Sequence, residues 1–208
     1  MPSVGQVVEL NRRTFVGASI AVGGAVATAP LLAGCGEDER ANKSTSSAVR
    51  LRVNGEDREI EVDNRTSLLD TLRERAGLPG TKKGCDQGAC GACTILANGQ
   101  RVVSCLTLAV MHDGAEITTI EGLEHNGRLH PLQQAFIDEQ AAQCGYCLNG
   151  MIMSAKALLE RNPEPDDDAI RDALRFNLCR CGTHFEIVNA VRRAAQYLRH
   201  EGAHESGR

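Results

Sequence analysis

Residues Gly84–Cys105 read GCDQGACGACTILANGQRVVSC, and the rest of the chain is organised around this stretch. Its first three cysteines have the C-x4-C-x2-C spacing of a plant-type [2Fe–2S] loop, and a fourth follows after eleven further residues. An isolated C-x2-C pair would be weak support for a metal site, whereas four cysteines at this spacing are strong support. The predicted ligands of the first cluster are Cys85, Cys90, Cys93 and Cys105.

Gly84 precedes the first of these cysteines, and Gly88 and Gly91 lie between the cysteines that follow. A loop that wraps a cluster must turn sharply and bring backbone N–H groups close to sulfur, and glycine permits both. Lys82 and Lys83 precede the loop, where they could steer an acidic redox partner, although a solvated pair of surface lysines is the commoner explanation.

A second group of four cysteines lies nearer the C-terminus, and it consists of Cys144, Cys147, Cys179 and Cys181. A disulfide scaffold fits this pattern poorly, because Cys179 and Cys181 are too close in sequence to bridge easily. Zinc is an alternative, since C-x2-C followed by C-x-C can hold it. The spacing of the two groups together favours iron–sulfur clusters over zinc and over disulfides.

The 208 residues carry a formal net charge of −4 and no tryptophan. Mild acidity and few aromatic side chains provide neither a basic face nor a stacking surface, so the sequence predicts no binding of nucleic acid. The length allows one large or two small domains, with cores built from aliphatic side chains.

Residues 1–34 are expected to be an export segment rather than part of the fold. Arg12 and Arg13 open the run RRTFV, which resembles the twin-arginine export signature, and no charged residue occurs between Phe15 and Ala33. The paired arginines could instead be a coincidence, and the uncharged run could be an uncleaved membrane span. Export of a folded protein suits a cluster-binding chain, because the cluster is acquired in the reducing cytoplasm.

The four residues LAGC that end at Cys35 resemble the bacterial lipoprotein box, in which the cysteine is lipidated and becomes the new N-terminus. The alternative is an unmodified Cys35 beside an ordinary cleavage site, although Pro30 would hinder cleavage there. Residues 35–48 are polar and are interpreted as a flexible tether. The sequence therefore predicts a periplasmic protein that is anchored to the membrane by lipid.

Residues 49–125 are predicted to form a β-grasp, plant-type ferredoxin domain. Apolar alternation predicts strands, two Asn-Gly pairs predict hairpin turns, and Ser67 is expected to cap a helix that Gly77 ends. The expected strands are 49–53, 59–62, 94–97, 101–105 and 116–120, and the expected helix is 67–76.

Residues 126–208 are predicted to form a four-helix domain that binds the second cluster, so the fold class is α+β. Helical periodicity and capping signals place the helices at 131–140, at 145–160, from about 166 and after Thr183, which is paired with Glu186 in a capping box. The second cysteine group falls at the start of the second helix and just before the fourth. Two helix N-termini would therefore face one anionic cluster and stabilise its charge.

The two motifs together resemble the small iron–sulfur subunit of the xanthine oxidase family of molybdenum hydroxylases. The resemblance covers about residues 49–200 and is most specific at QCGYC (Gln143–Cys147) and CRCG (Cys179–Gly182). Parts of the chain look like periplasmic aldehyde oxidoreductase subunits, and others look like the small subunits of nicotinate or isoquinoline dehydrogenases.

The resemblance implies an electron-transfer subunit with two [2Fe–2S] clusters and no catalytic centre of its own. It implies that the second cysteine group holds the cluster nearer the molybdenum and that the first group holds the outer one. It also implies that Gln143 contacts a molybdopterin cofactor, of the cytosine dinucleotide form, on a large partner subunit. Electrons from an aldehyde or an N-heterocycle would then pass to a flavin (FAD) subunit or to a cytochrome c.

Two other classes of protein stay open at this point. A free-standing two-cluster ferredoxin or redox-sensing module would need no helical domain fitted to a large partner. A lipoprotein stabilised by zinc or disulfides would be colourless when purified, whereas iron–sulfur proteins are coloured.

Overall fold

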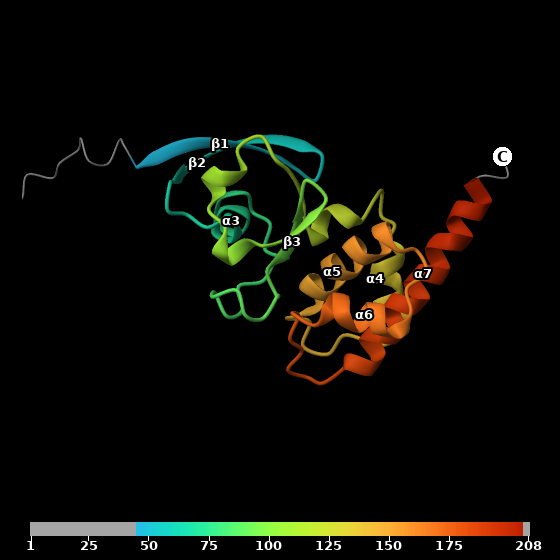
Figure 1. The fold of residues 1–208 in the computed structure, drawn as a ribbon. Helices are drawn as coiled ribbons and strands as arrows, with labels where there is room; N and C mark the ends of the chain where they lie inside the picture. The colour runs from blue at the N-terminus through green and yellow to red at the C-terminus, as the bar shows by residue number, and fades with distance from the viewer. Residues whose placement is uncertain (1–44, 206–208) are drawn as a thin grey trace, which may run out of the picture. The chain divides into compact units, whose positions relative to one another are not determined.

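The structure is a computed structural model that describes residues 45–205, drawn in colour in Figure 1. The predicted export segment with Arg12 and Arg13, the lipidation site Cys35 and most of the predicted tether lie outside the described residues. Within residues 45–205, no helix is both long enough and apolar enough to span a bilayer.

The described chain begins with an antiparallel hairpin of β1 (Ser46–Val53) and β2 (Glu56–Asp63). Asn54 and Gly55 have φ angles of 52° and 86°, the left-handed values that an Asn-Gly hairpin turn requires. β1 starts at Ser46, so residues 46–48 belong to the sheet and the predicted tether is shorter than expected. The first strand pairing was therefore predictable, and its extent was not.

Three further strands complete a mixed sheet with the order β2-β1-β5-β3-β4: β3 (Thr94–Ala97), β4 (Gln100–Val103) and β5 (Glu116–Thr118). β5 runs parallel to β1 and antiparallel to β3, so it joins the two hairpins. β4 ends earlier than expected, because the short 3-10 turn Ser104–Leu106, which carries Cys105, follows it directly.

The helix predicted at 67–76 has two parts. Ser67 caps α3 (Leu68–Asp70) by accepting a 3.0 Å hydrogen bond from the amide of Asp70, as expected. The chain then widens into the π-helical segment η1 (Thr71–Arg75). The first core lies between this segment and the sheet, and it includes Val49, Leu51, Val53, Leu68, Leu72, Ile95 and Ile117.

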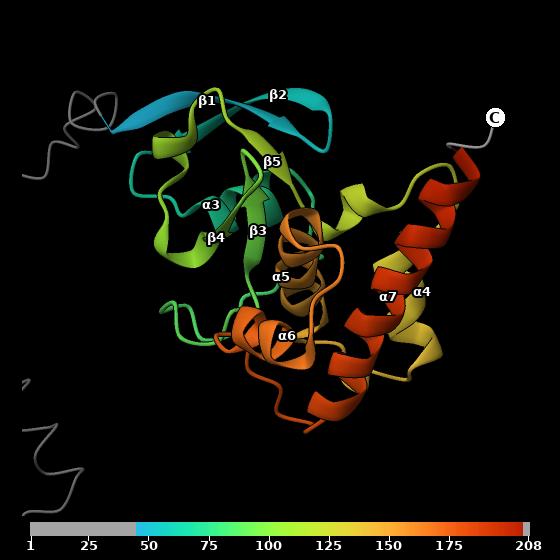
Figure 2. The same cartoon turned by 45° about the vertical axis from the view of Figure 1, so that its right-hand side comes forward.

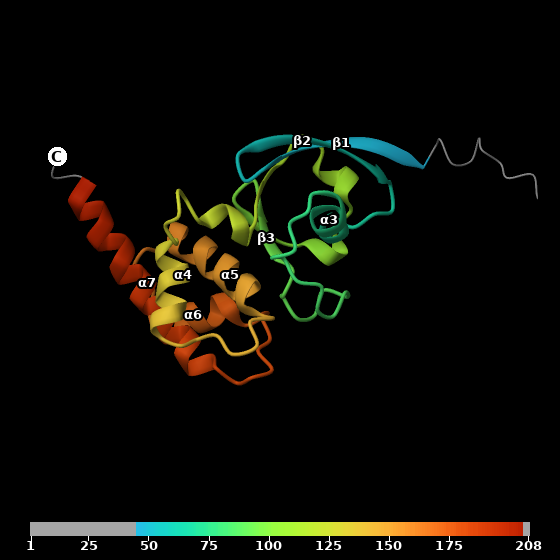
Figure 3. The same cartoon turned by 180° about the vertical axis from the view of Figure 1, so that it is seen from behind.

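The second half of the chain is helical, with α4 (Pro131–Asp138), α5 (Leu148–Arg161), α6 (Asp167–Leu174) and α7 (His184–Glu205). Seen from behind in Figure 3, α4 lies beside α7, with which it makes extensive contact. α5 begins three residues later than expected, because Gly145 adopts a φ of 74° and Cys147 stands at the N-cap. A second core fills the space between these helices.

β3 connects the two cores, because successive side chains of a strand point to opposite faces. Ile95 and Ala97 belong to the core of the sheet, whereas Leu96 belongs to that of the helices. Figure 2 shows α5 lying against β3 on this side. The residues from 45 to 205 therefore have an α+β fold in which a sheet region packs on a helical region.

Candidate metal centres

The first cysteine group lies on the loop between η1 and β3 and on the 3-10 turn after β4. Backbone N–H groups of this loop point at its sulfurs. The amide of Gly88 donates to Cys105 Sγ over 3.3 Å, and that of Ala89 donates to Cys85 Sγ over 3.2 Å. The amide of Cys85 in turn lies 3.4 Å from Cys90 Sγ. Donors in these positions stabilise the negative charge of a thiolate-ligated cluster.

The glycines of the loop have the two roles expected from the sequence. Gly88 and Gly91 have φ angles of 75° and 69°, which residues other than glycine rarely adopt. Gly84 matters for space, because a Cβ there would lie 2.8 Å from Cys90 Sγ. The loop is therefore wrapped closely around its own sulfur atoms.

The thiols of the first group approach one another in pairs, Cys85 with Cys90 and Cys93 with Cys105. Hydrogen bonds from backbone amides, that of Gln87 foremost, lower the pKa of Cys85 to about 7. Burial raises the pKa of Cys105 to about 11, and the neighbouring Cys93 adds to the rise. A bound metal deprotonates its thiol ligands, so iron would offset the cost of a buried thiolate at Cys105.

The second group also consists of two pairs, Cys144 with Cys181 and Cys147 with Cys179. Cys147 directly precedes α5, and Cys181 lies three residues before the first residue of α7. The prediction that two helix starts adjoin this group is confirmed by the bounds of the two helices. Their free N–H groups and positive ends favour an anion at this place.

Thr183 has a role at this site that the sequence did not reveal. Burial raises the pKa of Cys147 to about 12. Burial also acts to raise the pKa of Cys179, but hydrogen bonds from the hydroxyl and amide of Thr183 and from the amide of Gly182 bring it down to about 7. The Thr183 hydroxyl oxygen lies 3.4 Å from Cys179 Sγ and 3.2 Å from the carbonyl oxygen of Ala141, so its single proton is shared between these two acceptors. A residue expected only to cap α7 therefore contacts a predicted ligand.

The donor set fits a two-iron cluster at each group. All eight cysteines among the described residues are free thiols in this structure. Tetrahedral zinc would need all of its ligands around a single ion. A [2Fe–2S] cluster instead takes two thiolates on each iron, and the paired thiols match that requirement.

Three consecutive carbonyls of the first loop accept hydrogen bonds from residues that flank the second cysteine group. The amide of Leu178 donates to the carbonyl of Cys90 over 2.9 Å. The side chain of Asn177 donates to Gly91 over 3.0 Å, and that of Asn149 donates to Ala92 over 2.6 Å. Both asparagine side chains are buried. The two candidate centres are therefore joined by a fixed polar junction.

The same junction explains a glycine on α5. A Cβ on Gly150 would overlap the carbonyl oxygen of Gly91, so only glycine lets the helix approach the first loop this closely. Ser154, one turn further along, donates a 2.8 Å hydrogen bond to the Oδ1 of Asn177. The sequence analysis did not identify Gly150, Ser154 or Asn177, because nothing near them in the sequence indicates a contact with a loop so distant in the chain.

Apolar side chains are exposed around the second cysteine group. Tyr146, Phe176, Leu178 and Phe185 have exposed fractions of 49%, 64%, 60% and 73%. Beside them, between α6 and α7, is a hollow of about 450 Å³ that Leu178 and Phe185 help to line. Gln143, the predicted molybdopterin contact, is also exposed, next to Cys144.

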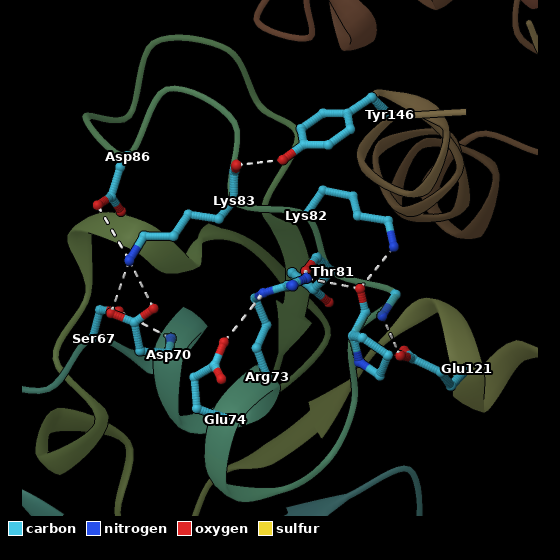
Figure 4. Close-up of polar contacts among 12 residues, drawn as sticks. Ser67, Asp70, Arg73, Glu74, Thr81, Lys82, Lys83, Asp86, Glu121 and Tyr146 are labelled. Atoms are coloured by element: carbon cyan, nitrogen blue, oxygen red, sulfur yellow. Dashed lines mark hydrogen bonds and ion pairs between the residues drawn. The ribbon is translucent and has the colours of Figure 1, made fainter. Parts of the chain in front are cut away.

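The lysines before the first loop make contacts within the protein, as Figure 4 shows. The Nζ of Lys83 lies 2.9 Å from Asp70 and 3.4 Å from Asp86, and the Nζ of Lys82 donates to the carbonyl of Pro79 over 2.8 Å. This placement supports a structural role more than a free steering pair. The Lys83 carbonyl accepts a hydrogen bond from Tyr146.

Comparison with known proteins gives matches to two families along the chain. Residues 51–118 match the model of a 2Fe-2S iron-sulfur cluster binding domain, and residues 119–192 match that of a [2Fe-2S] binding domain. The boundary between the two falls directly after β5. Each match contains one of the two cysteine groups.

Individual relatives are similar over most of their length. The aldehyde oxidoreductase iron-sulfur-binding subunit PaoA of Escherichia coli is 52% identical over 160 residues, which are 70% of this chain and 70% of that protein. One of the nicotinate dehydrogenase subunits of Pseudomonas putida is 54% identical over 153 residues, 74% of this chain and 98% of the relative. A chain in the crystal structure of quinoline 2-oxidoreductase from Pseudomonas putida superposes with a TM-score of 0.72 at 42% identity, covering 75% of this chain and 98% of that one.

Proposed function

Because this chain belongs to the small iron–sulfur subunits of the xanthine oxidase family of molybdenum hydroxylases, we propose that it relays electrons from a molybdenum centre to an external acceptor. Its status as one component of an oxidoreductase complex follows from the family. The direction of the relay, its acceptor and the substrate class are our proposals.

The observation that carries the relay is the hydrogen bond between Leu178 and Cys90. Leu178 is covalently next to Cys179, so a short path of covalent bonds and one hydrogen bond links a predicted ligand of each group. The residues that would hold the inner [2Fe–2S] cluster are Cys144, Cys147, Cys179 and Cys181, and those for the outer cluster are Cys85, Cys90, Cys93 and Cys105. Such clusters supply one-electron redox chemistry when bound.

The large subunit is proposed to dock over the second cysteine group. A partner would bury the exposed apolar side chains there, and patches of this kind mark protein interfaces. Gln143 lies at the same place and is exposed, which suits contact with a molybdopterin cytosine dinucleotide held by that subunit. The helix starts behind the patch would favour negative charge on the inner cluster.

Two pairs of alternatives concern what lies at either end of the relay. The relatives' names include an aldehyde oxidoreductase and a nicotinate dehydrogenase, so we propose an aldehyde or an N-heterocycle as the substrate of the complex. The outer acceptor would be an FAD subunit or a cytochrome c. A free-standing ferredoxin or sensor is disfavoured, because it would leave the apolar patch without a partner.

The domain plan and the cellular location are also proposals. Residues 49–125 would be a β-grasp ferredoxin domain and residues 126–208 a four-helix domain. Residues 1–34 would direct export by the twin-arginine route, and a lipid on Cys35 with the tether up to residue 48 would hold the protein at the periplasmic face of the membrane.

The proposal is tested on the complex rather than on the isolated chain. The chain is expressed with a candidate large molybdenum subunit from the same genome, and the purified complex is mixed anaerobically with an aldehyde, nicotinate or quinoline. At least one substrate should reduce both clusters, which is observed as loss of their visible absorption. The isolated chain should be reduced by dithionite and by none of these substrates. A purified chain that binds no large subunit would overturn the relay.

A further inference from the structure

Tyr146 belongs to the second cysteine group by sequence, yet its side chain reaches the first loop. It lies between Cys144 and Cys147, and its hydroxyl donates a 2.5 Å hydrogen bond to the carbonyl of Lys83. Figure 4 shows the ring extending from the start of α5 to that carbonyl. Lys83 stands two residues before the predicted ligand Cys85.

The peptide that receives this bond is part of the wall around the first sulfurs. A Cβ on Gly84 would lie 2.8 Å from Cys90 Sγ and 3.8 Å from the ring of Tyr146, so the tyrosine and the sulfur flank the same short segment. The side chain of Lys83 is held by Asp70 and Asp86, as described above. The segment is therefore held by the lysine side chain and by the tyrosine hydroxyl.

Hydrogen bonds to sulfur and the rigidity of their donors help to set the reduction potential of an iron–sulfur cluster. The Lys83–Gly84 segment leads directly into the amide of Cys85, which faces Cys90 Sγ. The Lys83 carbonyl belongs to the peptide unit just before that of the Cys85 amide, so the hydrogen bond from Tyr146 acts on this amide by fixing its position. Loss of the hydroxyl should weaken the N–H···S contacts and disfavour the more negative, reduced cluster.

We propose that the hydroxyl of Tyr146 is a positioning group through which the loop of the second cluster tunes the reduction potential of the first. This inference rests on the proposed function, since it requires a [2Fe–2S] cluster at each cysteine group. It is independent of the direction of electron flow and of the substrate.

The test is a redox titration of the full chain followed by paramagnetic resonance. Tyr146→Phe removes the hydroxyl and keeps the ring. Tyr197→Phe is the matched control, because Tyr197 is the other tyrosine of the chain and its hydroxyl donates to Asp138 on the helical domain. The signal of the first cluster is identified by its loss in Cys90→Ser.

In Tyr146→Phe the first cluster should titrate at a lower potential than in the wild type, while the second is unmoved. Tyr197→Phe should move neither. An unchanged potential in a Tyr146→Phe protein with full iron and sulfide content overturns the inference and leaves the proposed function intact. A wild-type protein without two paramagnetic clusters would instead overturn the proposed function.

A second measurement covers the case in which Tyr146→Phe fails to bind its clusters. Tyr197→Phe leaves Tyr146 as the only tyrosine, so 3-fluorotyrosine supplied during growth enters that position alone. The fluorinated phenol is the stronger donor and keeps the ring in place. The potential of the first cluster should rise, and a potential equal to that of the unfluorinated protein contradicts the proposal.

Discussion

The backbone amide of Leu178 donates a 2.9 Å hydrogen bond to the carbonyl oxygen of Cys90. One of these residues precedes a predicted ligand of the second group, and the other is a predicted ligand of the first. The next two carbonyls of the loop, those of Gly91 and Ala92, accept hydrogen bonds from the buried side chains of Asn177 and Asn149, so the bond is the first of three consecutive contacts. The geometry between the two candidate clusters is thus fixed by the fold itself.

The first prediction concerns metal content. The chain purified anaerobically from cytoplasm should contain four irons and four acid-labile sulfides, because each group of four thiols binds one [2Fe–2S] cluster. Reduction with dithionite should give two distinct paramagnetic signals, since the surroundings of the two groups differ. Stoichiometric zinc without labile sulfide would contradict this account.

The second prediction concerns the polar junction. Asn177→Ala removes the side-chain donor to the Gly91 carbonyl and leaves the buried hydroxyl of Ser154 without its acceptor, which should reduce the free energy of unfolding by about 1–3 kcal/mol. Asn189→Ala is the matched control on α7, where Asn189 contacts the exposed Arg192, and it should change stability by less than about 0.5 kcal/mol. If denaturant titrations gave the same loss of unfolding free energy for both variants, the buried contacts of Asn177 would contribute no more to stability than an exposed hydrogen bond does.

The third prediction concerns the start of α4. His130 Nδ1 accepts a 3.1 Å hydrogen bond from the amide of Leu132, and Gln133 completes the capping box. Burial, with a smaller effect of Lys156, lowers the pKa of His130 from 6.5 to about 4. The folded state therefore binds the proton less well than the unfolded state. The stabilisation is complete above pH 6.5 and is lost as the pH falls toward 4.

His130→Asn provides the comparison, because asparagine also caps helices but does not titrate in this range. The difference in Tm between wild type and variant should be constant above pH 6.5 and should shift against the wild type at lower pH. A difference that does not vary with pH would show that the cap is not the titrating element.

The fourth prediction concerns export. Replacing Arg12 and Arg13 by lysine should leave folded, cluster-bearing protein in the cytoplasm, because the twin-arginine route reads that pair. Cys35→Ser should remove the lipid. Mass spectrometry of the mature N-terminus decides the second point, and an unmodified Cys35 or a start at another residue excludes lipidation.

The sequence allowed prediction of the features that depend on local chemistry. The Asn-Gly turns, the cap at Ser67 and the position of Cys147 at the start of a helix follow from short-range rules, and the structure confirms them, although the helix begins one residue after Cys147. The ligand groups were recognisable because a cluster imposes fixed spacings on its cysteines.

Features that depend on distant partners were not predictable. The parallel pairing of β5 with β1 joins segments more than fifty residues apart, and nothing in either strand specifies the other. The role of Thr183 at Cys179 and the contact between Gly150 and Gly91 likewise arise only after the two regions pack. The segment predicted as one helix at 67–76 is also partly π-helical, over Thr71–Arg75.

The order of the relay is tested most directly by rapid-freeze paramagnetic resonance of the assembled complex after mixing with its substrate. Cys90→Ser disables the outer cluster and Cys147→Ser the inner one, and each variant must first show that its other cluster is intact, because cluster binding and folding are coupled. We predict that substrate still reduces the inner cluster in Cys90→Ser, whereas the outer cluster stays oxidised in Cys147→Ser. Prompt reduction of the outer cluster in Cys147→Ser would contradict the proposed order.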